Sequence, residues 1–260
     1  MNIIVALSTG VLSGGYAYSN AIDSWLIYGF FSFFSTLAVY NGQRLFKAKS
    51  FEQTPWLKWV DENRSGLLIL SVTSGIGACA TLLLLPKIEH VTMVLLGWSG
   101  LISTLYVLKI KGMNMRQIPH LKIHLIAISW VAVVIVFPAV NESKEEALVW
   151  SAVAHYIYVL AVTIPFDIRD LKHDIPEQRT IPQVVGVRGS KFISIVLLLC
   201  FAITMLYFVE PFLLLNPWFF ISIFVQIVLV LFMNEKRSDI YCAGMIDGSI
   251  VLLGFSYFLY

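Results

Sequence analysis

Three aspartates, Asp167, Asp170 and Asp174, follow one another at intervals of three and four residues. On an α-helix, at about 100° per residue, this spacing places them within an arc of roughly 60°. Like charges on one helical face repel each other, so a cation between them would stabilise the arrangement. Mg²⁺ prefers oxygen ligands and usually binds through a few carboxylates together with the phosphates of a substrate. The motif therefore predicts a site for Mg²⁺ and a diphosphate; the alternative is a solvated helix end whose neighbouring basic residues balance the acids.

The composition indicates a membrane protein. Of the 260 residues, 58% are hydrophobic and 13% are charged, whereas charged residues make up about 25% of a soluble domain. The net charge of +2 gives no reason to expect a nucleic-acid partner. The three scattered cysteines form no C-x-x-C pair and are expected to act as small hydrophobic residues within helices. The start of the chain has no pattern of a cleavable signal peptide, so the first apolar run is expected to be retained.

The apolar runs predict one all-α domain over residues 1–260, a polytopic membrane bundle of about nine transmembrane helices. A helix needs about 20 predominantly apolar residues to cross a bilayer. Glycines in the first span, Gly10, Gly14 and Gly15, permit close packing against another helix. Because the first and fourth spans are short, eight or ten spans are alternatives. The predicted spans cover residues 2–18, 24–45, 66–85, 91–108, 122–140, 147–165, 191–209, 213–233 and 242–260.

The basic residues predict the orientation of this bundle. The loops after the second, fourth, sixth and eighth spans hold 16 of the 18 lysines and arginines. Since cytoplasmic loops carry the excess of Lys and Arg, we expect the N-terminus and these loops to be cytoplasmic, in the cell (inner) membrane. The two long loops, about 46–65 and 166–190, would then cap an active site on the cytoplasmic face. Asp247 is an acid within the last span, so it is a functional candidate or a hydrogen-bond partner for a neighbouring helix.

The nine predicted spans, the two long loops and the D-x-x-D-x-x-x-D motif together resemble the UbiA superfamily of intramembrane prenyltransferases over essentially the whole chain. The family's second aspartate motif corresponds to Asp167, Asp170 and Asp174. The stretch at 179–182, Arg-Thr-Ile-Pro, followed by Gly186, is similar to the segment that comes after that motif in the family. The resemblance implies a transferase that moves an isoprenyl group from a polyprenyl diphosphate to an aromatic or other lipophilic acceptor. In that enzyme the three aspartates would be catalytic and would bind Mg²⁺.

Basic and polar side chains are expected to hold the diphosphate. Lysine binds phosphate as a point charge, and arginine binds it in a fork geometry. The loop between the fourth and fifth predicted spans, with its edges, holds a set that is similar to the phosphate-binding residues of the family: Tyr106, Lys109, Arg116 and Lys122. The candidates are Asn41, Arg44, Lys47, Tyr106, Lys109, Arg116, Lys122, Lys172 and Arg179.

The first aspartate motif of the family is degenerate in this chain. Asn41 matches its leading asparagine, but Gly42, Leu45 and Lys49 stand where aspartates are expected. A single Mg²⁺ at the second motif could suffice, or basic residues such as Arg44 could contact phosphate directly. An acid further along the same loop, in the stretch 52–62, is a third possibility. Arg44 and Lys47 could also simply anchor the helix at the cytoplasmic surface.

The sequence therefore predicts a UbiA-like prenyltransferase and leaves two alternatives open. One is a catalytically reduced relative that binds a prenyl lipid or a protein partner. The other is a small membrane transporter, which would place polar residues in the middle of several spans. His120 and His124 share a helical face four residues apart, but with no third ligand we interpret them as interfacial residues.

Overall fold

The computed structural model describes residues 2–48, 55–108, 115, 118–144, 146–172, 174 and 176–259. In these ranges the regular secondary structure is entirely helical, as the sequence predicts. The elements in chain order are α1 (Ile3–Ser19), α2 (Trp25–Ala48), α3 (Pro55–Glu62), α4 (Arg64–Leu83), α5 (His90–Leu105), α6 (Leu121–Val131), the π-helix η2 (Ala132–Val136), α7 (Phe137–Asn141), α8 (Leu148–Asp170), the 3₁₀-helix η3 (Pro176–Gln178), α9 (Ile181–Thr204), the π-helix η4 (Met205–Val209), the 3₁₀-helix η5 (Pro211–Leu215), α10 (Pro217–Leu231), the π-helix η6 (Tyr241–Ile246) and α11 (Asp247–Ser256).

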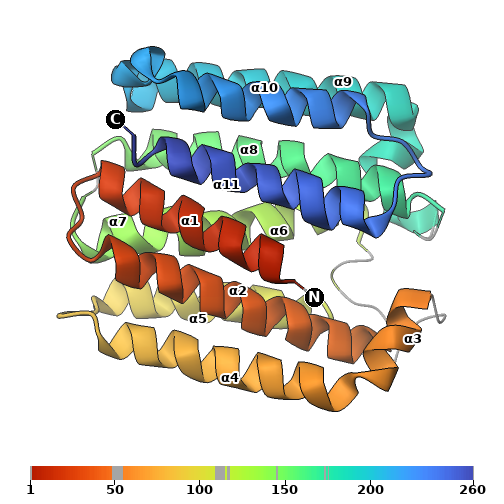
Figure 1. Ribbon diagram of the computed structural model, residues 1–260, viewed down its shortest axis with the longest axis horizontal. Coiled ribbons are helices and arrows are strands. Elements are labelled where there is room, and N and C mark those ends of the chain that lie inside the picture. Colours follow the sequence, from red (N-terminus) through yellow and green to blue (C-terminus); the bar gives the residue numbers. More distant parts are fainter. Residues whose placement is uncertain are drawn as a thin grey trace.

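The long helices run side by side along one axis of the molecule (Figure 1). Helix α1 packs between α2 and α11, α4 covers α2, and α9 packs on α8. The N- and C-termini lie at opposite ends of this bundle. We call the end that holds Asn2, Arg44, Asp167 and Asp239 the charged end, because charged and amide side chains meet there.

The helices have the length and composition of membrane helices. Within the described residues, four segments are long and apolar enough to cross a membrane: Arg64–Leu83, Leu121–Asn141, Leu148–Asp170 and Ile181–Val209. Large hydrophobic side chains on the outside are strongly exposed; Leu83, for example, is 85% exposed. Extensive exposed apolar surface is rare on soluble monomers. The chain is therefore best described as an all-helical membrane protein.

Two helices extend further toward the charged end than the sequence predicts. Helix α8 continues to Asp170, so Asp167 and Asp170 lie in its last turn, not in a loop. Helix α9 begins at Ile181, ten residues before the predicted span. The backbone N–H of Thr180 donates to Oε1 of Gln183 at 2.9 Å, which satisfies a backbone donor at the start of the helix. The connection between the two helices is consequently short.

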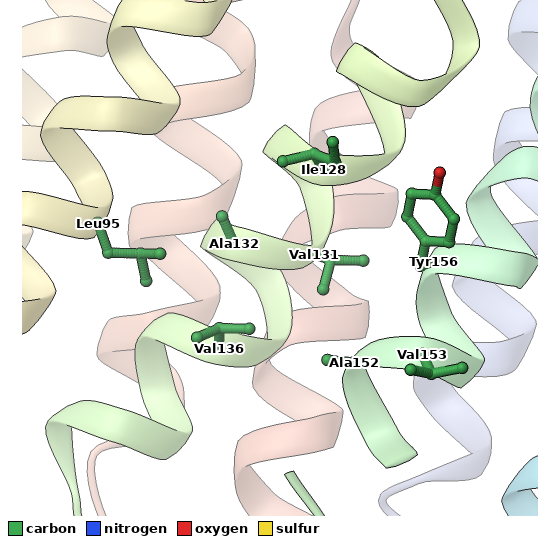
Figure 2. A pocket seen from close by; sticks show the side chains of 8 residues that line it. All are labelled: Leu95, Ile128, Val131, Ala132, Val136, Ala152, Val153 and Tyr156. Atoms are coloured by element: carbon green, nitrogen blue, oxygen red, sulfur yellow. The ribbon is translucent and has the colours of Figure 1, made fainter. Parts of the chain in front are cut away.

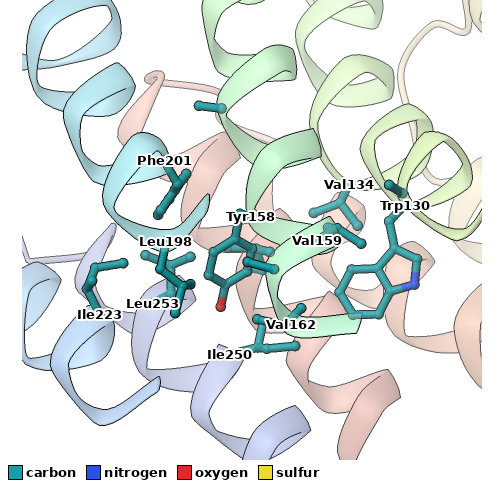
Figure 3. Packing of buried hydrophobic residues seen from close by; sticks show 14 of the residues in the cluster. Trp130, Val134, Tyr158, Val159, Val162, Leu198, Phe201, Ile223, Ile250 and Leu253 are labelled. Carbon is teal, nitrogen blue, oxygen red and sulfur yellow. The ribbon is translucent and has the colours of Figure 1, made fainter. Parts of the chain in front are cut away.

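The largest buried cluster lies around α8. Figure 3 shows Tyr158 of α8 between side chains of α9, such as Leu198 and Phe201, and side chains of α11, such as Ile250 and Leu253. These five side chains are buried almost completely. The helix that carries the aspartates is thus held on several sides by apolar packing, which fixes where its charged end lies.

Helices α1 and α11 meet through glycine backbones. A Cβ atom on Gly15 would lie 2.2 Å from the carbonyl oxygen of Gly254, and one on Gly254 would lie 2.6 Å from the backbone nitrogen of Leu12. The close packing predicted from the glycines of the first span is therefore confirmed for Gly15. Only glycine permits this approach, because any Cβ would collide with the facing backbone.

We expect Gly254→Ala to destabilise the protein by about 1–3 kcal/mol, because backbone atoms have no rotamer with which to give way. Thermal unfolding in detergent measures the effect. The matched control is Gly75→Ala on α4, where an added Cβ meets nothing within 4 Å. Alanine is the better helix former, so this control should unfold at the same or a higher temperature. Equal stability of both variants would mean that α1 and α11 are not in close contact.

Candidate functional site at the charged end

Three carboxylates converge on one lysine at the charged end. Nζ of Lys122 lies 2.6 Å from Oδ1 of Asp167, 3.2 Å from Oδ2 of Asp174 and 4.0 Å from Oδ2 of Asp170. The side chains of Lys122, Asp167 and Asp174 are 8%, 1% and 2% exposed, whereas Asp170 is 24% exposed. The predicted clustering of the three aspartates toward one cationic centre is thus present, and the cation at that centre is an ammonium.

The start of α6 brings Lys122 to the aspartates. His120 adopts a left-handed backbone conformation (φ 60°) just before the helix, and its N–H donates to the carbonyl of Gln178 at 3.1 Å. This hydrogen bond ties the start of α6 to η3, the short helix that follows the aspartate motif. The contact joins parts of the chain that are far apart in sequence, so spacing alone could not reveal it.

A second group of charges flanks the first. Arg169 donates from Nε to Oδ1 of Asp170 at 2.8 Å, and its Nη1 lies 3.1 Å from Oδ1 of Asp239. Asp170 therefore lies between Lys122 and Arg169 and links the two groups. Asp239 comes from the connection between α10 and η6, which the charge pattern predicted to be on the same side as the aspartate motif. Its pairing with Arg169 was not predicted.

The degenerate first motif contributes a buried amide network. Nδ2 of Asn2 donates to Oδ1 of Asn41 at 3.0 Å, and Nδ2 of Asn41 donates to the carbonyl of Leu37 at 2.8 Å. Nε of Arg44 donates to Oδ1 of Asn2 at 3.0 Å. Both polar atoms of Asn41 are therefore occupied within the protein, so the structure assigns Asn41 a role in fixing α1 against α2. The charges of Arg169, Asp239 and Asp170 act on the guanidinium of Arg44.

The remaining predicted phosphate ligands do not gather at one place: one is buried, two are exposed, and the others lie outside the described residues. Tyr106 is buried at the C-terminal end of α5. Lys172 and Arg179 are exposed and pair with no described acid. Lys109, Arg116 and the side chain of Lys47 lie outside the described residues.

The donors at the aspartate motif suit a hard divalent cation in their chemistry. Oδ2 of Asp167 is buried and has no hydrogen-bond partner among the described residues, and such an atom is rare in a folded protein. Carboxylate oxygens are the ligands that Mg²⁺ prefers. However, no three acids, histidines or cysteines of the described part are gathered closely enough to hold a metal. Mg²⁺ would have to take the place of the Lys122 ammonium among these oxygens.

The histidines serve as hydrogen-bonding residues. Nδ1 of His124 lies 2.5 Å from the hydroxyl of Tyr156, and His155 contacts the carbonyl of Ser151 and the hydroxyl of Tyr257. His124 and His155 thus each have polar partners within the protein.

A cavity of about 340 Å³ opens between α5, α6, η2 and α8, and neither Lys122 nor the aspartates line it. Its lining is apolar except for Tyr156, whose hydroxyl is seen at one side in Figure 2. A cavity of this character suits a hydrocarbon chain. The lining residues are Leu95, Ile128, Val131, Ala132, Val136, Ala152, Val153 and Tyr156.

Comparisons of this chain with protein-family models, with curated proteins and with solved structures each return no match. The class that fold and site define is therefore an all-helical membrane protein with an acid–lysine cluster at one end of its bundle.

Proposed function

We propose that this chain is a UbiA-like membrane prenyltransferase that takes an isoprenyl group from a polyprenyl diphosphate and transfers it, with Mg²⁺, to a lipophilic acceptor. The observation that carries the proposal is the convergence of Asp167, Asp170 and Asp174 on a single cationic centre at the end of an apolar bundle. A diphosphate with a long hydrocarbon tail needs this combination, because its charged head requires cations and its tail requires an apolar environment.

The proposed arrangement in the membrane follows the sequence. The helices from α1 to α11, apart from α3, form nine segments that would cross the bilayer. The charged end would face the cytoplasm, because the loops after the second, fourth, sixth and eighth predicted spans hold 16 of the 18 basic residues. The diphosphate would then reach the aspartates from the cytoplasmic side.

Each group at the charged end has a proposed role. Asp167, Asp170 and Asp174 would hold Mg²⁺, which would neutralise the diphosphate as it leaves. Lys122, released from the carboxylates, and Arg44 would bind phosphate oxygens as a point charge and as a fork. Oriented charges of this kind stabilise a leaving group because they need no reorganisation during the reaction.

Departure of the diphosphate would leave an allylic cation on the isoprenyl group, and aromatic side chains next to the charged end would stabilise it. Nε1 of Trp130 donates to the hydroxyl of Tyr40 at 2.9 Å, which fixes both rings at the side of the core. The faces of aromatic rings attract cations, and the attraction is strongest where water is excluded. The helix interfaces and the apolar cavity offer room for the hydrocarbon tail.

The test uses the purified full chain with geranyl, farnesyl and geranylgeranyl diphosphates and an extract of membrane lipids as the source of acceptor. We expect Mg²⁺-dependent pyrophosphate release. The double variant Asp167→Asn, Asp170→Asn should reduce it by at least about 100-fold, the usual effect of removing groups that stabilise developing charge. The control is Asp23→Asn, at an exposed acid in the connection between α1 and α2, which should keep the wild-type rate. Failure to bind any of the three diphosphates would contradict the proposal.

A specific observation favours a second candidate, a catalytically reduced relative that binds a prenyl lipid. Lys122 already neutralises Asp167 and Asp174, and Asn41 is saturated by internal hydrogen bonds. This candidate predicts that an isoprenyl diphosphate binds but that no pyrophosphate is released, even when acceptor lipids are supplied.

A further inference from the structure

Two basic side chains that are far apart in the sequence meet at the C-terminal end of α10. Nζ of Lys191, on α9, donates to the carbonyl oxygen of Leu231 at 2.8 Å. Nε of Arg237, in the connection that follows α10, donates to the carbonyl oxygen of Phe232 at 3.0 Å. The last carbonyls of a helix have no partner within the helix, so both cations satisfy exposed acceptors. Because the two carbonyls belong to adjacent residues, the cations lie within roughly 10 Å of each other.

These contacts fix the two cations and use few of their donors. An ammonium has three N–H donors and a guanidinium has five, and each group donates once to the end of α10. The guanidinium carbon of Arg237 also lies 4.6 Å from the centroid of the Tyr241 ring, whose hydroxyl donates to the carbonyl oxygen of Leu229 at 2.7 Å. A guanidinium that stacks on a ring is held in place while its edges remain able to bind a further acceptor.

The positive charge at this place is not balanced by acids. Two more basic residues, one helical turn before the lysine on α9 and directly before the arginine, are exposed. No acid in the described part of the chain forms an ion pair with any of the four. The carboxylate of Asp239 is paired with Arg169, which leaves Glu235 as the other acid of the stretch 232–240. The end of α10 supplies only about half a negative charge. We call the four residues the basic rim: Arg188, Lys191, Lys236 and Arg237.

Exposed apolar side chains begin directly beside the basic rim. Phe192 and Phe232 are 68% and 62% exposed. Further along α9, Val196, Leu199 and Ile203 are exposed as well, and their intervals of three and four residues place them on one face of the helix. Helices α9 and α10 lie side by side at one edge of the bundle (Figure 1). The basic rim thus lies at the end of a long apolar face, which is the arrangement that a lipid with a charged head group requires.

We propose that the basic rim binds the phosphate of an anionic phospholipid whose acyl chains lie along the exposed face of α9. Phosphate oxygens accept from a lysine as a point charge and from an arginine in a fork geometry. A soluble phosphate gains only these polar contacts, whereas a lipid also gains the apolar contacts beside them. The excess of positive charge selects a head group with a net negative charge over a zwitterionic one. The site uses no residue of the aspartate cluster, and the proposal does not depend on prenyl transfer.

The first experiment compares dioleoyl phosphatidylglycerol with dioleoyl phosphatidylcholine, which share their acyl chains, by native mass spectrometry of the purified full chain. We expect the anionic lipid to bind at least about tenfold more tightly, since each basic residue near an anionic surface contributes a factor of about five. The double variant Lys191→Gln, Arg237→Gln should bind the two lipids about equally, because glutamine can still donate to the carbonyls of α10 but carries no charge. The control is Lys58→Gln, Arg64→Gln, the same loss of charge at exposed residues of another connection, and it should keep the preference.

Three results of this experiment would overturn the proposal. One is equal binding of the two lipids to the wild type, and another is a preference that survives in the double variant. The third is an equal loss of preference in the control, because binding would then follow net charge and not the basic rim. Glycerol 3-phosphate, added in excess, should not displace the anionic lipid; displacement would show that the site takes a soluble phosphate.

A second measurement uses the unmodified protein and so does not depend on the folding of a variant. The full chain is placed in vesicles of phosphatidylcholine with or without phosphatidylglycerol and treated with an amine-acetylating reagent. The anionic lipid should slow the acetylation of Lys191 by at least about fivefold, whereas the exposed Lys58 should change by less than about twofold. Mass spectrometry of peptides gives both rates. Equal changes at the two lysines, or none at Lys191, would contradict the proposal.

Discussion

Replacing Lys122 by methionine should destabilise the protein by about 3–5 kcal/mol when no divalent cation is present. Methionine keeps the length of the side chain and removes the only cation within 4 Å of Asp167 and Asp174 among the described residues. These carboxylates are 1% and 2% exposed, so water cannot take over the role of the ammonium. Removing one partner of a buried ion pair costs this much because the remaining charge is left uncompensated. Thermal unfolding in detergent should show a decrease of roughly 10 °C.

The same variant tests whether the aspartates can hold a metal. Without the ammonium, Mg²⁺ meets no competing cation at the three carboxylates, so Lys122→Met should regain stability as Mg²⁺ is added. At about 100 times the dissociation constant the gain would be close to 2.7 kcal/mol. The wild type should respond less, because Mg²⁺ must first displace Lys122. If the stability of Lys122→Met does not change as Mg²⁺ is added, the aspartates form an ion-pair cluster and do not bind the metal.

The control for this prediction is Lys172→Met. Lys172 follows the same aspartate-bearing helix but is exposed and pairs with no described acid. Surface charges of this kind contribute little to stability, so the control should unfold within about 1 °C of the wild type. If Lys122→Met behaved like Lys172→Met, the lysine would not be held among the carboxylates.

Arg44→Gln should weaken the binding of farnesyl diphosphate by roughly 10- to 100-fold. Arg44 belongs to the degenerate first motif and lies at the charged end, where the charges of Arg169 and Asp170 act on its guanidinium. If it contacts phosphate directly, glutamine removes a charge-assisted, fork-shaped contact worth about 1.5–3 kcal/mol. Arg44→Lys should be intermediate, because lysine keeps the charge and loses the fork. Isothermal titration calorimetry with and without Mg²⁺ gives the three affinities.

Arg64→Gln provides the comparison for Arg44. Arg64 belongs to the same predicted basic loop, but it is 41% exposed and only approaches Asp61 at 3.9 Å. Its loss should leave the affinity for farnesyl diphosphate unchanged. An Arg44→Gln protein that unfolds at a lower temperature but binds with wild-type affinity would assign Arg44 to the amide network with Asn2 and not to the ligand.

Much of the fold follows from the sequence. Apolar runs of membrane-spanning length predict helices wherever they occur, because a bilayer satisfies no backbone hydrogen bonds. The glycines of the first span predict close packing, and Gly15 does meet Gly254. Helix ends were less accurate at polar stretches: α9 begins at Ile181, ahead of the predicted span, and its backbone leaves helical geometry at Gly186 (φ 72°). The hydrogen bond between Thr180 and Gln183 stabilises its first turn.

The candidate site also combines features that the sequence predicts with features that only the tertiary structure sets. Residue types and spacing predicted three carboxylates on one helical face, and Asp167 and Asp170 do lie in the last turn of α8 because that geometry is local to one helix. Asp174 lies beyond the end of α8 and approaches the same lysine from the following turn. Only the tertiary structure decided what meets them. The partner of Asp167 is Lys122, 45 positions earlier in the chain, and the partners of Arg44 and Arg169 are Asn2 and Asp239. Helix packing sets such contacts between distant segments, and no periodicity within one segment records them.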